Sequence, residues 1–536
     1  MKLHTKRNST ILILLHFLFL AFSFGQCKLN LNNPADPFSK SFLETFLLNA
    51  YFDSFCDPNV RGNIRLGSGT KMIKPMSIKT LRSGKTVVTA ITEEPLVWNG
   101  TADGIHSNHQ NSTFNAVTFV IDRHFSKILW LDYLGEMSYG IEDWPHDPIV
   151  SVDEFSNGDL GFFVLVNGPG RSNTINDKVN NVSYYLGRYN QDTGAIVWQG
   201  YANKDNTRIA ISGYGLKIND RDEMVLRFTS TTSATPSSDT VGLSFPGLPT
   251  PQTATNGSIA NQTEVGIAII SGDGVGKIQS FFPNPGNPTE TVDHFVIGDK
   301  IYIFGNTNTN FVSTSGHPSV NEKRSFIGIA NQNLTWDSVG YFGTSASTSE
   351  TNIEFVTYGN GKFLLIGKST NAFSNAGTLY PFQGSGLNRN YFFTSSTINS
   401  TTPNWFQFLG STTVQVPQIY PNAFTYRSTT DEFLGELLAN DDGSLFTGIP
   451  SDLVTGSIQN PFGQVRAKLV PQSGQFKTLE YFNGSEAGGN NVTTLTNQTE
   501  ICRGRIVKTK FLSPTFSSVT SIRSIEVSTR PASEEP

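Results

Sequence analysis

Cysteine and charged residues are scarce in this 536-residue chain, and each scarcity argues against a class of protein. Three cysteines are too few for a disulfide-stapled scaffold, because such scaffolds are dense in cysteine. The fold must therefore rely on a hydrophobic core, which a chain of this length can supply. Charged residues make up 15% of the chain and form no basic stripe, which argues against a nucleic-acid partner.

Long stretches rich in Ala, Leu, Glu and Lys are missing after residue 60, so we expect few helices. Long apolar runs are missing too, except for Ile11–Gly25. That run of about 15 residues is short for a membrane-spanning helix, which needs roughly 20. The polar residue His16 within the run is a further argument against a membrane-spanning helix. Lys2, Lys6 and Arg7 precede the run, and a positive segment before a short apolar core is typical of an export signal.

Motifs that carry catalytic chemistry are also missing. No G-x-S-x-G, H-E-x-x-H or dinucleotide-binding glycine motif occurs. The stretch "SGDGVGK" (Ser271–Lys277) lacks the Ser or Thr of a phosphate loop, and strands are expected on both sides of it. We predict a hairpin turn there. The sequence therefore indicates no catalytic residue and no cofactor, and an enzyme is the less favoured class.

Metal sites are not indicated either. His106 and His109 could offer two imidazoles, but a site needs further ligands in space, so we expect a solvated loop. Acidic residues at predicted turns could hold calcium through oxygen ligands, but no calcium-loop pattern is present. These residues are Asp220, Asp222, Glu223, Asp441 and Asp442.

Cys27 ends the N-terminal apolar segment, and three uses for it are open. It could pair with Cys56, or stay alone while Cys56 pairs with Cys502, and composition cannot choose between these. The third use is lipid attachment: "FGQC" (Phe24–Cys27) is a loose form of the bacterial lipoprotein signal, in which the Cys becomes the first mature residue. Ordinary cleavage after Gly25 is the alternative.

The segment after Cys27 favours lipid attachment. "CKLNLNNPADPFSKSFLETFLLNAYF" (Cys27–Phe52) resembles the start of spirochaetal lipoproteins of the leptospiral kind, in which a polar tether follows the lipidated Cys. The resemblance implies acyl chains such as palmitate on Cys27 and a place in the cell envelope, at the periplasmic or surface face of the outer membrane. Asp36 and Pro37 suit the N-cap and first position of a helix, which apolar spacing extends to about Phe55.

A repeat runs through the rest of the chain. One half-unit, "MSIKTLRSGKTVVTAIT" (Met76–Thr92), is a pair of apolar runs about a polar turn. A second half-unit, "NAVTFVIDRHFSKILWLDYLG" (Asn115–Gly135), follows it, and six such pairs lie in series up to about Gly484. Two hairpins make a four-stranded unit whose apolar faces need neighbours, and radial stacking supplies them. We therefore predict an all-β fold, a β-propeller.

Two features refine this prediction. Trp130 with Gly135, and "GDKIYIFGNT" (Gly298–Thr307), resemble the W-x-x-x-x-G and G-x-x-Y-x-x-G-x-T elements of the bacterial β-propeller repeat family. Residues 63–74 could complete a last blade with the C-terminal strands, which gives seven blades, with six as the alternative. Four Trp residues begin last strands, and we expect them to pack between adjacent blades: Trp130, Trp198, Trp336 and Trp405.

These observations predict a signal peptide at 1–26, a tether at 27–36, a helix and connection at 37–60 and the propeller at 61–536. The hypothesis for function is a monomeric lipoprotein, held to the membrane by its N-terminal lipid, whose propeller binds an extracellular or envelope protein or glycan. Long polar inserts, 229–264 and 373–390, are expected on a binding rim. One rival is a glycan-active enzyme with charged side chains converging on the central channel. Another is a secreted eukaryotic glycoprotein with glycans on Asn99 or Asn491.

Overall fold

The computed structural model describes Asn59 to Pro531 except 99–101, 106–113, 138–149, 167–169, 179–182, 203–213, 232–239, 250–251, 254–262, 282–288, 308–323, 344–350, 373–378, 381, 384–388, 411–423, 440–447, 457–462, 483–495, 502–503 and 513–523. The chain divides into two compact units, Met1–Phe55 and Cys56–Pro536, and the described residues all belong to the second. The signal peptide, the tether with Cys27 and the predicted helical segment after it lie outside the described residues.

Seven antiparallel four-stranded arrays form the second unit, and we number them as blades along the chain. Blade 1 consists of β2 (Ile73–Thr80), β3 (Thr86–Thr92), β5 (Asn115–Ile121) and β6 (Ile128–Glu136). Blade 2 consists of β7 (Val150–Glu154), β8 (Leu160–Val166), β9 (Ser183–Tyr189) and β10 (Ile196–Ala202). Blade 3 consists of β11 (Gly215–Ile218), β12 (Glu223–Thr231), β15 (Thr263–Ser271) and β16 (Gly276–Phe281).

Blades 4 to 7 repeat the same arrangement. Blade 4 consists of β17 (Thr289–Ile297), β18 (Lys300–Thr307), β19 (Arg324–Asn331) and β20 (Trp336–Phe342), and blade 5 of β21 (Thr351–Gly359), β22 (Lys362–Ser369), β23 (Asn390–Thr397) and β24 (Trp405–Leu409). Blade 6 consists of β25 (Phe424–Arg427), β26 (Glu432–Ala439), β28 (Gly463–Leu469) and β29 (Phe476–Phe482). Blade 7 consists of β30 (Thr496–Ile501), β31 (Arg505–Leu512), β32 (Ser524–Pro531) and β1 (Gly62–Leu66).

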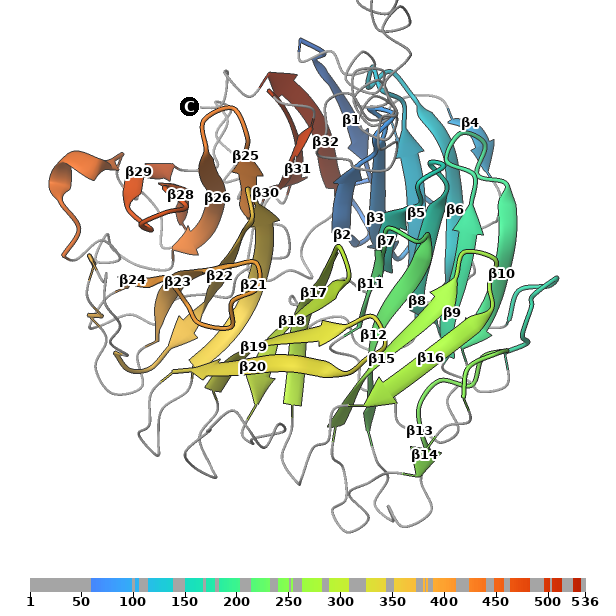
Figure 1. Ribbon diagram of the computed structural model, residues 1–536. Coiled ribbons are helices and arrows are strands. Elements are labelled where there is room, and N and C mark those ends of the chain that lie inside the picture. Colours follow the sequence, from blue (N-terminus) through green and yellow to red (C-terminus); the bar gives the residue numbers. More distant parts are fainter. Residues whose placement is uncertain are drawn as a thin grey trace, which may run out of the picture. The chain divides into compact units, whose positions relative to one another are not determined.

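The first strands of the seven blades touch one another in sequence and close a ring. β2 contacts β7, β7 contacts β11, and the series continues through β17, β21 and β25 to β30, which contacts β2 again. These seven strands are therefore the inner strands of a β-propeller, and Figure 1 shows the blades following the colour order of the chain around it. The prediction of an all-β, seven-bladed propeller is confirmed for the described residues.

The ring is closed by a strand from the N-terminal end of the propeller. β1 pairs antiparallel with β32, with Ile64 opposite Val527 and Leu66 opposite Ile525. Figure 1 places the blue β1 beside the dark red β32. Ile64, Leu66, Ile525 and Val527 are all buried, so the paired strands bring apolar side chains as well as backbone hydrogen bonds to the seam with blade 1. The predicted mixing of both ends in the last blade is confirmed.

Apolar side chains are shared between neighbouring blades, which explains the sequence pattern. Every residue of β3, "TVVTAIT", and of β8, "LGFFVLV", is buried, because these middle strands have a blade on each side. One buried cluster joins blades 1, 2 and 3, and others join successive blades around the ring. These strands therefore read as continuous apolar runs and not as a strict alternation of apolar and polar residues.

The outer edges of five blades carry a segment from the connection between their own second and third strands. β4 (Ala102–Ile105) pairs in parallel with β6, and β27 (Val454–Thr455), after the short 3-10 helix η4 (Ser451–Leu453), pairs in parallel with β29. In blades 2, 3 and 5 a backbone hydrogen bond joins such a segment to the outer strand. Ile175 N–H donates to Gln199 O at 2.7 Å, Gly276 N–H donates to Pro246 O at 2.7 Å, and Phe408 N–H donates to Tyr380 O at 3.1 Å. These segments satisfy backbone groups of outer strands that would otherwise be free to pair with another chain.

Part of the insert 229–264 serves this purpose and does not simply project from a rim. Within it β13 (Thr240–Val241) pairs with β14 (Gln252–Thr253). The backbone N–H of Leu243 donates to Gln279 Oε1 of β16 at 2.9 Å, and Gln279 Nε2 donates to Pro249 O at 2.7 Å. Residues 243–249 of this insert therefore cover the edge of blade 3.

Candidate functional site

The two faces of the ring differ in their connections. Hairpins within each blade are joined by tight turns after its first and third strands, such as those between β7 and β8 and between β9 and β10. Because the strands are antiparallel, the connections after the second and fourth strands lie at the opposite face. We call these the turn face and the loop face. Residues 203–213, 232–239 and 411–423 lie outside the described residues.

Tryptophans of one blade donate hydrogen bonds to the next blade at the turn face, and we call each of these contacts a tryptophan latch. The indole Nε1–H of Trp130 donates to Gln191 O at 2.8 Å, that of Trp198 to Gly272 O at 2.7 Å and that of Trp405 to Pro471 O at 3.2 Å. Each acceptor lies in the turn before the fourth strand of the next blade. The prediction that these residues pack between blades is confirmed for these three. The ring of Trp336 lies over Gly328 of its own blade.

The turns that accept the hydrogen bonds of Trp198 and Trp405 contain glycines at positions where a side chain would collide with the indole ring. At Gly274, in the turn between β15 and β16, φ is +79°, and a Cβ would come within 3.0 Å of the Trp198 ring. This turn lies within "SGDGVGK", so the predicted hairpin turn is confirmed. At Gly474 a Cβ would come within 2.3 Å of the Trp405 ring. A side chain at either glycine would push the indole away from its acceptor.

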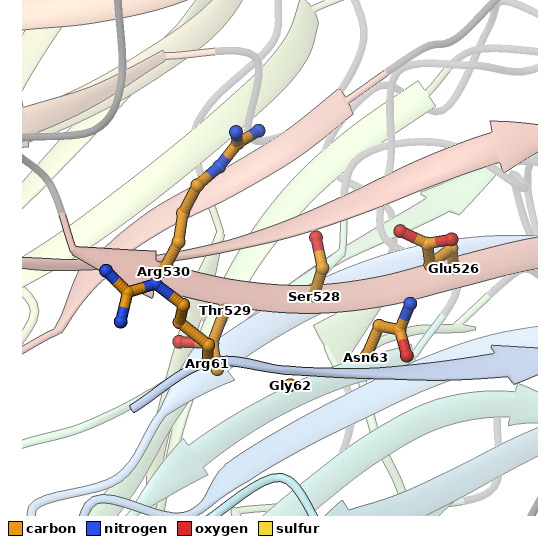
Figure 2. A pocket seen from close by; sticks show the side chains of 7 residues that line it. All are labelled: Arg61, Gly62, Asn63, Glu526, Ser528, Thr529 and Arg530. Atoms are coloured by element: carbon orange, nitrogen blue, oxygen red, sulfur yellow. The ribbon is translucent and has the colours of Figure 1, made fainter. Parts of the chain in front are cut away.

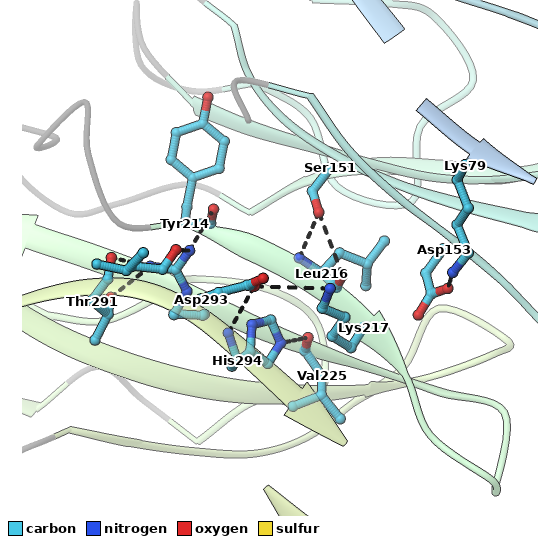
Figure 3. A network of polar contacts seen from close by, with 12 residues as sticks. Lys79, Ser151, Asp153, Tyr214, Leu216, Lys217, Val225, Thr291, Asp293 and His294 are labelled. Atoms are coloured by element: carbon cyan, nitrogen blue, oxygen red, sulfur yellow. Dashed lines mark hydrogen bonds and ion pairs between the residues drawn. The ribbon is translucent and has the colours of Figure 1, made fainter. Parts of the chain in front are cut away.

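Charged side chains of the inner strands pair between blades, and Figure 3 shows this network. Lys79 of β2 forms an ion pair with Asp153 of β7, and Asp153 Oδ2 also accepts the Ile218 N–H of β11 at 2.7 Å. Lys217 of β11 lies 3.8 Å from Asp293 of β17. Positive and negative groups therefore alternate across the inner strands of blades 1 to 4, where each neutralises the next.

Glu154 is a second inner-strand carboxylate at the seam of blades 1 and 2. Its Oε2 accepts the backbone N–H of Arg82 at 3.0 Å, and the Arg82 guanidinium lies 3.5 Å away. Burial raises the pKa of Glu154, and the hydrogen bond and charge of Arg82 oppose that rise. Glu154 therefore holds the turn of blade 1 against blade 2.

Arg227 and His294 lie fully buried at the seam of blades 3 and 4, and Figure 3 shows His294 beside Val225. Arg227 of β12 donates from Nη1 to Thr291 Oγ1 at 2.7 Å and from Nη2 to Val292 O at 2.9 Å. His294 Nε2 lies 3.0 Å from Val225 O, so it carries the proton of the neutral ring, while Nδ1 has no hydrogen-bond partner. Burial, and then the charges of Arg227 and Lys217, hold the pKa of His294 well below its usual value.

A buried cluster of polar side chains occupies the seam of blades 1 and 2. Asp132 of β6 is fully buried and accepts two hydrogen bonds from Arg171, at 2.8 and 3.2 Å. The hydroxyl of Tyr189 donates to Asp132 at 3.0 Å, and that of Tyr185 donates to Gln199 Oε1 at 2.7 Å. Burial raises the pKa values of both phenols, so both are protonated at neutral pH.

Arg171 belongs to the described segment 170–178, which follows the second strand of blade 2 on the loop face. Its backbone N–H donates to the Tyr201 hydroxyl at 2.7 Å, and the next residue's carbonyl accepts from Gln199 Nε2 at 2.7 Å. The Asp132 pair therefore holds a loop-face segment against the blades. Sequence patterns did not identify this cluster, because Asp132 and Arg171 come from distant segments and Arg171 lies in an irregular one.

The acidic residues singled out from the sequence lie at a turn, as expected. Asp220 and Asp222 lie between β11 and β12, and Glu223 begins β12. Asp222 accepts the Ser156 backbone N–H at 2.6 Å, which ties blade 3 to blade 2, and Glu223 accepts from Asn219 at 2.7 Å. Lys277 lowers the pKa of Glu223 by hydrogen bonding, against the effect of burial. These contacts give them a structural role.

The remaining sequence candidates lie outside the described residues. They are Cys27, Cys56, Cys502, His106, His109, Asp441 and Asp442. Within the described ranges no group of three or more His, Cys, Asp or Glu side chains is placed to hold a metal ion. Nor does any helix in those ranges have the length and apolar character needed to cross a bilayer.

Comparisons with known proteins find no family for this chain and only remote likenesses among solved structures. No protein-family model matches the sequence, and no curated protein matches it. A protein of unknown function from Dyadobacter fermentans is similar in structure, with a TM-score of 0.41 and 10% identity over 88% of this chain and 98% of its own. An α-L-arabinofuranosidase from Fusarium graminearum has a TM-score of 0.34 and 10% identity, over 72% and 94% of the two chains.

The NanB sialidase from Streptococcus pneumoniae is similar at a TM-score of 0.37 and 12% identity, over 87% of this chain and 69% of its own. The strand order and the closed ring of inner strands are what define the chain as a seven-bladed β-propeller.

Proposed function

We propose that this protein is an exported lipoprotein, anchored through acyl chains on Cys27, whose propeller is a binding module for an extracellular or envelope protein or glycan. The export signal, "FGQC" and the polar tether support the anchor. Two acyl chains on one residue give stable anchoring, whereas one chain gives marginal binding. The tether then separates the anchor from β1, the first strand of the ring.

One observation carries the binding assignment: four charged side chains on the inner strands of blades 1 to 4 are used for pairing between blades. Lys79 with Asp153 and Lys217 with Asp293 neutralise each other across seams. An enzyme of the central channel needs ionised groups directed at a substrate. Side chains that are ion-paired between blades are not directed at a substrate in the channel. Binding through the loop face is therefore the function that this scaffold supports best.

The anchor is tested by phase partition and mass. The protein is expressed with its signal in a Gram-negative host, extracted in a detergent that separates into two phases, and its N-terminal peptide is weighed. Wild type is expected in the detergent phase with an acylated Cys27 as its first residue. Cys27→Ser should move to the aqueous phase, while the matched variant Cys56→Ser should stay in the detergent phase. An unmodified Cys27, or Cys27 in a disulfide, contradicts the anchor.

The binding assignment is tested separately. Purified protein is incubated with a panel of polymeric glycans and envelope proteins, and both bound material and newly formed reducing ends are measured. Retention without cleavage is expected. Reducing ends that accumulate in proportion to enzyme concentration contradict a binding module and favour the glycan-active enzyme. Glycan mass on Asn99 or Asn491, after expression in the native cell, would instead favour a secreted glycoprotein.

A further inference from the structure

A lysine, an asparagine and a glutamate lie together at the loop-face end of blade 5, and we call them the blade 5 trio. Asn352 of β21 is directly opposite Lys368 of β22 in the strand register. Glu354 lies at the bulge of β21, and its Oε1 is 3.1 Å from Lys368 Nζ. Residues directly opposite in antiparallel strands have Cβ atoms about 4.5–5.5 Å apart on one face. The Asn352 carboxamide is therefore a neighbour of the Lys368 side chain, whose amine contacts Glu354.

The blade 5 trio lies beside apolar side chains. Ile366, two residues before Lys368 on the same face, and Tyr391, opposite Lys368 on β23, belong to the buried cluster that blades 5 and 6 share. The Lys368 side chain is 5% exposed and that of Glu354 is 11% exposed. Asn352 Oδ1 is buried and has no hydrogen-bond partner. The three reactive groups are thus largely shielded from water.

Burial changes the chemistry of this lysine. It lowers the pKa of Lys368, the charge and hydrogen bond of Glu354 oppose the fall, and the charge of Arg389 adds to it. A lysine becomes a nucleophile when its surroundings favour the neutral amine. Because burial penalises charged groups, one proton moving along the 3.1 Å contact turns the ion pair into a neutral amine and a neutral acid.

We propose that Lys368 and Asn352 form an isopeptide bond, with Glu354 as the proton carrier. Nζ of Lys368 attacks Cγ of Asn352, the Cγ–Nδ2 bond breaks, and a new amide joins the two side chains. Both protons that Nζ loses pass through the Glu354 carboxylate to Nδ2, which departs as ammonium, and Glu354 returns to the carboxylate. The reaction needs no oxidant, reductant or other co-reactant. It rests on blade 5 alone and is independent of a lipid on Cys27.

The chain contains two internal controls. In blade 4, Lys300 is opposite Asn331, and its Nζ donates to Asn331 Oδ1 at 2.7 Å and forms an ion pair with Asp337. We call these three residues the blade 4 trio. It is more exposed, and the hydrogen bond to Asp337 raises the pKa of Lys300, so this amine stays protonated and no bond is expected. The second control has no amine: Figure 2 shows Asn63 of β1 beside Ser528 of β32, its partner in the register.

Peptide mapping of the denatured, trypsin-digested full chain tests the bond. Residues 325–362, which contain Asn352, and residues 363–389, which contain Lys368, should stay joined after cleavage at Lys362 and weigh one ammonia less than their sum. Fragment ions should place the link at Asn352, and cleavage after Lys368 should be blocked. Linear peptides of full mass would overturn the proposal. Loss of ammonia from an unlinked 325–362 peptide is the signature of a succinimide and would overturn it too.

Three variants assign the roles, each checked for folding by its unfolding midpoint. Glu354→Gln keeps the shape of the side chain but cannot carry protons, so the linked peptide should accumulate after synthesis about a hundredfold more slowly than in wild type. Lys368→Arg and Asn352→Ala should abolish the link. Equal rates in wild type and Glu354→Gln would refute the role of the glutamate, and a link in the blade 4 trio would refute the requirement for burial. If a variant does not fold, the wild-type peptide map decides alone.

Discussion

Acid sensitivity at the seam of blades 3 and 4 is the prediction that the structure determines most closely. His294 is fully buried, and its Nδ1 has no hydrogen-bond partner. Protonation would create a buried cation with an unsatisfied N–H, beside the cationic side chains of Arg227 and Lys217. Asp293 on the same strand offsets this only in part, because it already accepts the His294 backbone N–H and lies near Lys217.

The sign of the effect follows from proton linkage. The pKa of His294 is well below 6.5 in the folded protein, and the unfolded chain has the ordinary value. Between these two values the unfolded state binds more protons, so stability is fully present above pH 6.5 and is lost as the pH falls below it. One group changes stability by about 1.4 kcal/mol per pH unit in that window. From pH 6.5 to 5.0 the loss is about 2 kcal/mol, against a usual net stability of 5–15 kcal/mol.

Urea unfolding followed by tryptophan fluorescence at pH 7.5 and 5.0 checks this. His294→Gln keeps an N–H donor for Val225 O and removes the titrating group, so its loss of stability between the two pH values should be smaller than that of wild type by about 2 kcal/mol. His124→Gln, at an exposed position, is the control and should follow wild type. Equal pH dependence in wild type and His294→Gln would refute the reasoning. If His294→Gln does not fold, hydrogen exchange at the His294 ring C2 position gives its pKa in wild type, and an ordinary value would refute it too.

Three further substitutions test the seams, each by its unfolding midpoint in denaturant. Trp198→Phe removes the 2.7 Å hydrogen bond to Gly272 O while keeping an aromatic ring, so the free energy of unfolding should fall by about 1 kcal/mol. An unchanged free energy of unfolding would mean that this hydrogen bond does not stabilise the seam. Leu66→Ala opens the closing seam and should cost about 2–5 kcal/mol, whereas a cost below 1 kcal/mol would mean that β1 is dispensable. Asp132→Asn leaves the Arg171 charge without its carboxylate and should cost about 3–5 kcal/mol, and an unchanged midpoint would contradict the buried pair.

Local pattern was sufficient to predict the propeller, because each blade is built from hairpins close in sequence. The runs around Trp130, Trp198 and Trp405 predicted both a strand and a seam position, and the strand register confirms them. The closing strand was also predictable, since Ile64 and Leu66 alternate with polar residues as an edge strand should.

Contacts between blades were not predictable in the same way. Arg171 and Asp132 lie 39 residues apart, and nothing in the composition of either segment indicates the other. The pairing of Arg65 with Glu526 depends on the register between the first and last strands of the ring, which neither strand specifies alone. The edge segments, such as residues 175–176 beside β10, are too short and irregular to show a period.

The way in which the ring closes also sets an order on folding. Ile64 is made well before its partner Val527, so the closing sheet cannot form until the strands of all seven blades have been synthesised. Blades 1 to 6 can each assemble as their own residues emerge, whereas the first strand must wait, unpaired, for the last. Under the export proposed above, an unclosed chain would keep its blades open to unfolding, which suits threading through a translocation pore. Ring closure would then follow translocation.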